Sequence, residues 1–374
     1  MKMSAGIRQV TVLKKTVLFS IIHMLVDGLC AYAMASVLPG GCPVISIFII
    51  YNFCAFVLQM PVGAVIDVLI SRSGNTVLPL SLSIGGSVIT LVGSFMLVFL
   101  PGPVLLQYLG VVILGIGNAV FHVGGGVGSV IEDHMNSRKG MNLGLFVAPG
   151  ALGLYLGARF KTVSPVMVIL LYMLFAGVIM VFLSKAYSND KLIRKYRPDR
   201  SEFEGRDIIL IISCFLVVAL RSYIGFSVPM SWKTGMLLPL LAVLCVVLGK
   251  FGGGVLAAVF DVRAVIIVTL ILSAVGYAFI DIPVIGLITL FLFNTTMPVT
   301  LYLLVNRFRD MPGLYFGLLT AAQFAGYLLS KYPMVSTDKN SLTGTFGCIL
   351  SLGLLLAAAF VPGDSAFLKK RPDP

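Results

Sequence analysis

Charged residues are scarce in this sequence: they make up only 11% of its 374 positions, and histidine occurs three times. A soluble domain usually carries about 25% charged residues, so the composition argues against a water-soluble enzyme. Hydrophobic residues account for 58% of the chain and the mean hydropathy is +1.03. Disorder requires low hydrophobicity and is excluded. The remaining class is a membrane protein that crosses the bilayer many times.

Paired cysteines and the common catalytic motifs are also missing. The six cysteines form no CxxC pair, which excludes a disulfide framework and a zinc site built from cysteines. The chain contains neither an HExxH nor a GxSxG motif, the usual signs of zinc hydrolases and serine hydrolases. We therefore expect no enzymatic activity, no cofactor and no resident metal. An intramembrane enzyme and a receptor are the alternatives from other classes.

Long apolar runs dominate the chain. A helix needs about 20 apolar residues to cross the hydrocarbon core of a bilayer. Breaks at charged residues, proline and glycine divide the sequence into twelve such runs. The expected spans are residues 16–38, 45–69, 77–100, 104–130, 142–158, 165–184, 207–227, 236–260, 264–281, 284–305, 313–330 and 342–361. An even number of spans places both ends of the chain on one side of the membrane.

Basic residues mark the loops between these spans. Lys and Arg number 27 against 15 Asp and Glu, a net charge of +12. Twenty of the 27 fall in the termini and alternate loops, five fall in the other loops, and Arg221 and Lys250 fall inside spans. Because cytoplasmic loops carry the excess of Lys and Arg, we expect both termini in the cytoplasm and the protein in the plasma or inner membrane. The expected state is a monomer in lipid, without a nucleic-acid partner.

The longest polar stretch, residues 185–206, divides the chain into halves, 1–184 and 207–374, of six spans each. Such halves are often internal repeats in transporters. Asp67 lies near the end of the second span and Asp261 at the end of the eighth. The residues that precede each Asp are similar, and the two stretches are 194 positions apart. The sequence therefore predicts two related domains joined by a cytoplasmic linker.

Ionisable side chains inside the spans are the strongest functional signal. Each costs at least ~2.5–3.5 kcal/mol at mid-bilayer, so such residues face protein or water. His23 and Asp27 share one face of the first span, and the 194-residue offset aligns Asp27 with Arg221. The expected proton-coupling residues are Asp27, His23 and His122, and the expected substrate-binding residues are Arg221, Lys250, Asn118, Asn294 and Gln323.

Structural roles compete with these assignments. A hydrogen bond between helices would explain Asn118 or Asn294, and a satisfied interhelical contact would explain either histidine. Asp27 and Arg221 could form a static buried pair. Such a pair would be expensive without a function, because desolvation offsets much of its Coulomb energy.

Two acidic residues and three glycines are expected to act in conformational change. Asp67 and Asp261 lie at cytoplasmic helix ends, where a carboxylate binds loop cations or the end of a neighbouring helix. Gly150, Gly153 and Gly157 share the fifth span at a spacing that allows close helix packing. Packing alone would also explain the three glycines.

The chain resembles the major facilitator superfamily in its twelve spans, its central cytoplasmic loop and the Gly63-x-x-x-Asp67 pattern ending the second span. Its first half resembles the fosmidomycin-resistance branch. His23-Met24-Leu25-Val26-Asp27 is similar to a first-helix motif of the His-Leu-Leu-Asn-Asp type. Gly115-Ile116-Gly117-Asn118-Ala119-Val120-Phe121-His122 is similar to a fourth-helix Gly-x-Gly-x-x-Val-Phe-His motif.

Three positions depart from that branch. The Pro and Glu that commonly follow the fourth-helix histidine are Val123 and Gly124 here. The proline that closes the fifth-helix antiporter motif is Ala158. These departures concern the substrate and the efflux role more than the fold.

The resemblance implies an all-α membrane protein in which two six-helix bundles rock around a central site lined by the first, fourth, seventh and tenth helices. It also implies secondary active transport by alternating access. Arg221 and Lys250 favour an anionic group, so the expected cargo is a small organic anion or amphiphile exported in a proton-coupled antiport. Import, uniport and transition-metal transfer through His23, Asp27 and His122 are the alternatives.

Overall fold

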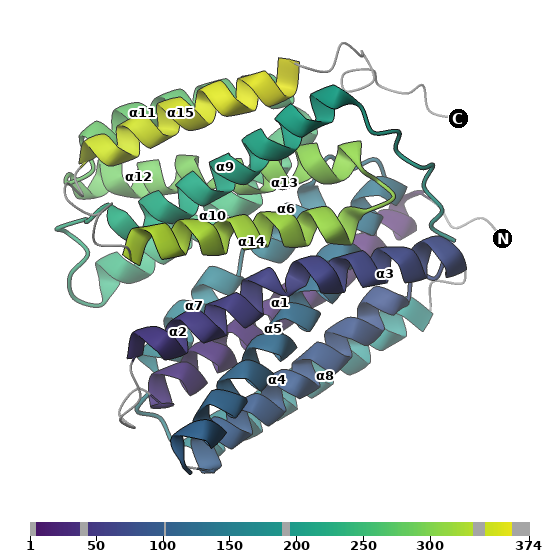
Figure 1. Cartoon of the computed structure of the whole chain (residues 1–374), viewed down its shortest axis with the longest axis vertical. Coiled ribbons are helices and arrows are strands. Elements are labelled where there is room, and N and C mark those ends of the chain that lie inside the picture. Colours follow the sequence, from purple (N-terminus) through teal and green to yellow (C-terminus); the bar gives the residue numbers. More distant parts are fainter. Residues whose placement is uncertain (1–4, 38–43, 101, 189–194, 332–340, 361–374) are drawn as a thin grey trace.

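The computed structural model describes residues 5–37, 44–100, 102–188, 195–331 and 341–360 (Figure 1). These residues form helices joined by turns and short irregular segments, and no β-strand occurs among them. In lipid every backbone polar group must be satisfied within the protein, and a helix achieves this within its own segment. The expected all-α class is confirmed.

The helices form two groups that follow the two halves of the chain (Figure 1). The first group contains α1 (Ala5–Val37), α2 (Val44–Asn52), the π-helical turn η1 (Phe53–Val57), α3 (Gln59–Ser73), α4 (Leu78–Phe99), α5 (Val104–Met135), α6 (Met141–Val147), α7 (Gly150–Arg159) and α8 (Pro165–Ser188). The second contains α9 (Gly205–Ser227), α10 (Leu237–Val259), α11 (Val262–Ala278), α12 (Pro283–Asn294), α13 (Thr296–Arg307), α14 (Pro312–Lys331) and α15 (Ser341–Phe360).

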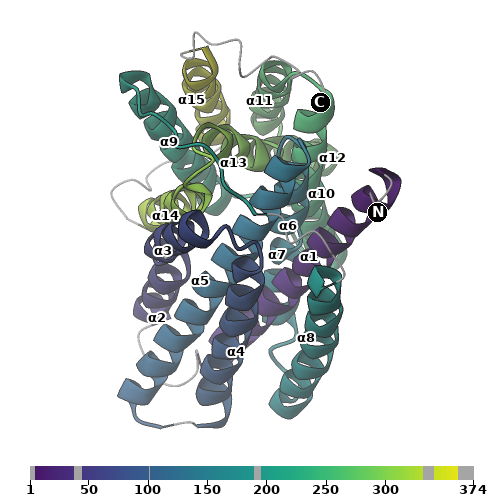
Figure 2. The ribbon, with the colours of Figure 1, turned by 90° about the vertical axis from the view of Figure 1, so that its right-hand side faces the viewer.

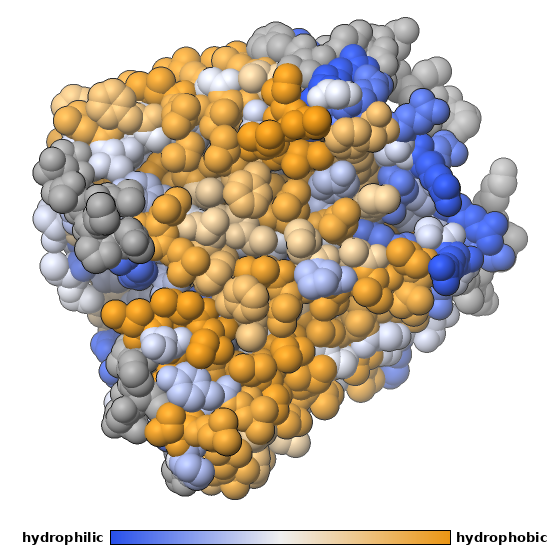
Figure 3. All heavy atoms as spheres, in the orientation of Figure 1, coloured by the Kyte–Doolittle hydropathy of each residue, from blue (hydrophilic) through white to orange (hydrophobic). Residues whose placement is uncertain are grey.

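Ten helical segments in the described part of the chain are long and apolar enough to cross a membrane. They correspond to ten of the expected spans, with ends that differ by a few residues. The two other expected spans correspond to α11, which has 17 residues, and to α14, which has 20 residues and is less apolar. Figure 3 shows a broad apolar belt across both groups, with hydrophilic residues gathered at the end where the 195–204 segment lies. This surface suits a protein embedded in lipid.

Three of the expected spans are interrupted. α2 and α3 are joined by the π-helical turn Phe53–Val57, and Pro61 lacks the N–H group that would bond to the carbonyl at position 57 in an α-helix. α6 and α7 are separated at Ala148 and Pro149, and Thr295 separates α12 from α13. Irregular backbone at membrane depth occurs where it is buried in protein or lines a cavity.

The two groups pack closely near the 195–204 segment. α3 lies against α14 (Figure 2), and α6 lies against α10. A Cβ on Gly63 would overlap the backbone carbonyl of Gly313. Glycine therefore lets these two backbones approach closely, and the space between the groups is closed at this end.

Tyr196 in the connecting segment contacts both groups. Its backbone N–H donates to the carbonyl of Gly74 at 3.2 Å. Its hydroxyl donates to the carbonyl of Arg309 at 2.7 Å and accepts from Nδ1 of His134 at 2.6 Å. Burial raises the pKa of the Tyr196 hydroxyl, which keeps this donor protonated. The connecting segment is thus attached to both halves at the closed end.

Candidate functional site

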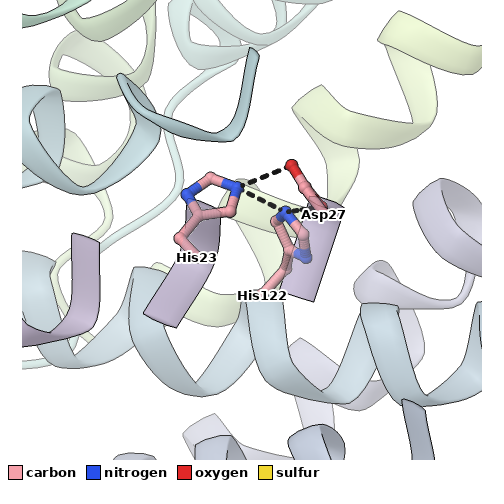
Figure 4. A group of neighbouring side chains, drawn as sticks. All are labelled: His23, Asp27 and His122. Atoms are coloured by element: carbon pink, nitrogen blue, oxygen red, sulfur yellow. Dashed lines mark hydrogen bonds and ion pairs between the residues drawn. The ribbon is translucent and has the colours of Figure 1, made fainter. Parts of the chain in front are cut away.

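Three ionisable side chains from α1 and α5 form one cluster (Figure 4). His23 Nε2 lies 3.1 Å from Asp27 Oδ2, and His122 Nε2 lies 3.6 Å from Asp27 Oδ1. The two Nε2 atoms are 2.8 Å apart. All three side chains are largely buried. The i, i+4 spacing predicted the pairing of His23 with Asp27, and the structure adds His122 to the same cluster.

Backbone carbonyls fix the tautomer of both histidines. His23 Nδ1 lies 2.7 Å from the carbonyl of Phe146, and His122 Nδ1 lies 2.8 Å from the carbonyl of Asn118. A carbonyl oxygen only accepts hydrogen bonds, so each Nδ1 carries a proton and donates. The 2.8 Å contact between the two Nε2 atoms is then a hydrogen bond only when one of them carries a second proton. With one additional proton, this geometry allows a hydrogen bond between the two imidazoles.

Neighbouring groups hold the carboxylate of Asp27 in place. Asn118 Nδ2 donates to Asp27 Oδ1 at 2.9 Å and also lies 3.6 Å from Cys30 Sγ. A Cβ at Gly150 would overlap His23 Nε2 and come close to Asp27 Oδ2, so glycine is needed there for the cluster to form. Asn118 thus acts within the proton cluster.

The other two glycines of the fifth span have a different role. A Cβ on Gly153 would overlap the carbonyl of Met24, and one on Gly157 would overlap the carbonyl of Gly28. Both glycines bring α7 against α1 through close backbone contact. The structure places only Gly150 at the cluster itself.

A cavity of about 190 Å³ lies beside the cluster, between the two halves. Eight of the expected functional residues line it. They are His23, Asp27, Asn118, His122 and Gly150 from the first half and Arg221, Lys250 and Gln323 from the second. Apolar side chains of Phe226, Phe316, Leu319 and Tyr327 complete much of the second half's wall. The cavity therefore combines a charged part with an apolar part, as ligand pockets generally do.

Two cations in this cavity have no counterion. Arg221 is only 9% exposed, and its Nε is buried without a hydrogen-bond partner. Within the described residues, neither Arg221 nor Lys250 forms a hydrogen bond or an ion pair. The static Asp27–Arg221 pair considered from the sequence is not formed, because Asp27 is bound by His23 and Asn118 instead. Burying an unpaired charge is costly, which points to an anionic ligand at these cations.

Asn294 does not line the cavity, contrary to its expected role in binding substrate. Its side-chain amide donates to the carbonyl of Leu290 in its own helix at 2.8 Å, and its Cβ packs near Gly249. This bond lies within α12 and is compatible with the structural role considered for Asn294 from the sequence.

The two related carboxylates at helix ends differ in their partners. Asp67 is buried and accepts hydrogen bonds from the backbone N–H groups of Gly313 and Leu314, at 2.9 and 2.8 Å, at the N-terminus of α14. Asp261 is exposed and accepts at 3.1 Å from Ala264 in α11, its own helix. Of the two, Asp67 joins the halves.

Several cavity residues were not among the sequence candidates. Tyr51, Asn52 and Gln59 line the first half's wall around the π-helical turn. The polar pair Tyr51-Asn52 inside an apolar run was the available signal, and π-helical turns are frequent at functional sites. Phe316 and Tyr327 could not be distinguished from ordinary apolar packing by sequence alone.

His23, Asp27 and His122 also offer ligand atoms for one metal ion, since one atom from each lies within 4.8 Å of the others. Two imidazoles and a carboxylate would suit a transition metal. Arg221 and Lys250 line the same cavity and would repel a dication. The two cations therefore disfavour a metal ion at this cluster.

A scan against models of protein families gave no match, and a search of curated proteins gave none. Solved structures do share the architecture. The crystal structure of the E. coli fucose:proton symporter FucP matches with a TM-score of 0.65 at 11% identity, covering 95% of this chain and 100% of that one. The crystal structure of the human organic anion transporter MFSD10 (TETRAN) matches with a TM-score of 0.60 at 15% identity, covering 93% and 99%. The chain shares its fold with these two transporters.

Proposed function

We propose that this protein is a secondary active transporter that moves a small organic anion with an apolar portion across the membrane, driven by protons. The main support for this proposal is that two cations without a partner, Arg221 and Lys250, line the cavity that also contains the cluster of His23, Asp27 and His122. A carboxylate, sulfonate or phosphonate would satisfy the guanidinium bidentately. Phe226, Phe316 and Tyr327 would contact the apolar portion.

In this proposal the chain crosses the membrane twelve times, as a monomer, with both termini in the cytoplasm of the plasma or inner membrane. The domains are residues 1–184 and 207–374, joined by the cytoplasmic segment 185–206. The excess of basic residues in one set of loops supports this orientation, as does the hydrophilic end in Figure 3. The junction of α3 with α14 then closes the cytoplasmic side.

Alternating access requires this junction to open. The contact of Gly63 with Gly313 and the hydrogen bonds of Asp67 would break as the cytoplasmic ends of α3 and α14 separate. The bonds of Tyr196 to both halves would have to rearrange in the same step. Asp67 is therefore proposed as a gating residue, together with the close packing that Gly153 and Gly157 allow. Asp261 is not proposed as a gating residue, because its carboxylate accepts a hydrogen bond from its own helix.

The direction of transport depends on how the proton and the substrate interact. Resemblance to the fosmidomycin-resistance branch implies export by antiport, in which proton and substrate exclude each other. The alternative is import by symport, in which the proton and the substrate move in the same direction. The solved structures with this fold include both a named proton symporter and a named organic anion transporter, so the fold is compatible with either coupling.

Transition-metal transfer is the second candidate function, favoured by the convergence of His23, Asp27 and His122. Flux of a divalent metal that is lost in both His23→Gln and His122→Gln, while organic anions are not moved, would establish it in place of anion transport.

The decisive experiment measures flux into proteoliposomes under an imposed pH gradient. Anionic, neutral and cationic aromatic solutes of similar size would be compared, with the recovered solute checked for chemical change. We expect gradient-dependent accumulation of unaltered anions and little movement of the cations. Anion flux that ignores the gradient would refute proton coupling, and preference for cations would refute the proposed cargo.

A further inference from the structure

We propose that the proton and the anion bind this cavity together and favour each other, so that the protein moves both in the same direction. This inference rests on the proposed function and gives the sign of its coupling. It follows from the separation of two subsites: a proton subsite at His23, His122 and Asp27, and an anion subsite at Arg221 and Lys250.

Antiport of an anion would need direct competition. The simplest device is a carboxylate that occupies the anion-binding arginine and leaves it on protonation or substrate arrival. Asp27 is the acidic residue that lines the cavity, and its oxygens are taken by His23 and by Asn118, at 3.1 and 2.9 Å. It forms no ion pair with Arg221 or Lys250. The anion therefore has free access to both cations while Asp27 stays within its own cluster.

The charges of the cavity then determine the sign of the coupling. Asp27 supplies one negative charge and Arg221 and Lys250 supply two positive ones, so the cavity carries a net +1 when both histidines are neutral. A proton shared between the histidines raises this to +2. An anion is attracted more strongly to the second state, and a bound anion in turn stabilises the proton. This reciprocity is required by thermodynamic linkage.

The two subsites are close enough to influence each other. The charge of Lys250 acts on His122 and on Asp27, and Arg221 acts on Lys250. The remaining titratable side chains that face the cluster are Cys30 and Tyr51, whose usual protonated forms are uncharged. They leave the sign of the cavity's charge unchanged.

Joint occupancy leads to symport. If the anion binds tightly only when the proton is present, the fully loaded and fully empty states are the ones populated during turnover. In the loaded cavity, the positive charges of Arg221 and Lys250 face the anion. The negative charge of Asp27 faces the shared proton. With an inward proton gradient the anion is carried inward, opposite to the direction implied by resemblance to the efflux branch.

The test measures proton exchange during binding. Benzenesulfonate is the probe, because its charge is constant across neutral pH and its ring suits the aromatic wall; benzenesulfonamide is its neutral counterpart. Purified protein in weakly buffered detergent solution would be titrated in the presence of a pH indicator. We expect proton uptake on binding of benzenesulfonate and none with benzenesulfonamide. The affinity for benzenesulfonate should rise by a factor on the order of ten as the pH is lowered, within the usual range of coupling between sites.

Variants separate the two subsites. His122→Gln keeps a hydrogen-bonding side chain but cannot share a proton, so benzenesulfonate should still bind, without proton uptake. Arg221→Gln should lose binding of benzenesulfonate. Arg159→Gln, which removes an exposed cation at the end of α7, is the control and should behave as the parent protein. Thermal unfolding would establish that each variant is folded.

The outcomes distinguish this inference from the function on which it rests. Proton release on binding, pH-independent affinity, or undiminished proton uptake in His122→Gln would overturn joint binding and leave anion transport intact. Failure of the parent protein to bind benzenesulfonate saturably would contradict the anion site itself and both proposals with it.

Discussion

The carboxylate of Asp67 in α3 accepts a hydrogen bond from the backbone N–H of Gly313 at 2.9 Å, at the first turn of α14 and across the boundary between the two halves. The N-terminus of a helix carries a partial positive charge and unpaired N–H groups. Asp67 therefore stabilises the closed junction both as a charge and as an acceptor. The related Asp261 has no such partner in the opposite half among the described residues.

Asp67→Asn should favour opening of the junction, since the amide keeps one acceptor but loses the charge. The closed state should lose about 0.3–1 kcal/mol, and up to ~2 kcal/mol in this buried setting. The measurement is maleimide labelling of a cysteine at Phe316, in a cysteine-free background, from the side of the 195–204 segment. Asp261→Asn is the matched control and should label as slowly as the parent. Equal labelling of both variants would show that the contact with α14 does not hold the junction closed.

Asp27→Asn should uncouple transport from the proton gradient. The amide preserves the shape of the side chain but removes the negative charge that stabilises a proton on the histidines. We expect gradient-driven accumulation in proteoliposomes to disappear, while exchange of labelled for unlabelled anion continues at equal pH. Full accumulation by Asp27→Asn would place the coupling proton elsewhere.

Arg221→Gln should abolish anion binding and at the same time stabilise the protein. The guanidinium is buried without a hydrogen-bond partner among the described residues, and an unpaired buried charge destabilises the folded protein by its desolvation cost. The midpoint of thermal unfolding in detergent should rise while binding of benzenesulfonate is lost. A lower midpoint would mean that Arg221 has a partner within the protein, and retained affinity would remove it from the anion site.

Gly150→Ala should disrupt the proton cluster, because the added methyl group would overlap His23 Nε2. We expect loss of gradient-driven accumulation, as in Asp27→Asn. Gly177→Ala in α8 is the control, since a Cβ there meets no atom within 4 Å. It should be active and slightly more stable, by up to about 1 kcal/mol, from the higher helix propensity of alanine. Normal coupling in Gly150→Ala would show that the cluster tolerates a displacement of α7.

The orientation can be tested with a membrane-impermeant maleimide. Cys42, which lies outside the described residues, should react from the outer side of intact cells. Lys195→Cys, at an exposed position of the connecting segment, should react only in inside-out vesicles. The reverse pattern would invert the topology and identify the closed junction as the outer one.

Much of the fold could be predicted from local sequence features. Hydropathy depends on a single segment at a time, and it predicted the ten helical segments of the described chain that are long and apolar enough to cross a membrane. The orientation expected from the positions of Lys and Arg stays a prediction. The pairing of His23 with Asp27 followed from helical spacing alone. Most of the polar residues placed in the spans do line one cavity, because polar groups in lipid must face protein or water.

The interactions that define the site depend on distant partners and could not be predicted. Asp67 bonds to residues 246 and 247 positions away, and no local pattern encodes that contact. The tautomer of His23 is set by the carbonyl of Phe146, a group that every residue possesses. Asn294 was assigned to substrate because it is a polar residue inside a predicted span, and the break at Thr295 beside it was not visible in a continuous apolar run.

The proton cluster belongs wholly to α1 and α5, whereas both unpaired cations belong to α9 and α10. In the proposed mechanism, proton coupling and cargo recognition therefore lie in separate halves of the chain. Substitutions in the second half alone would then change the solute that is bound and leave the proton site intact.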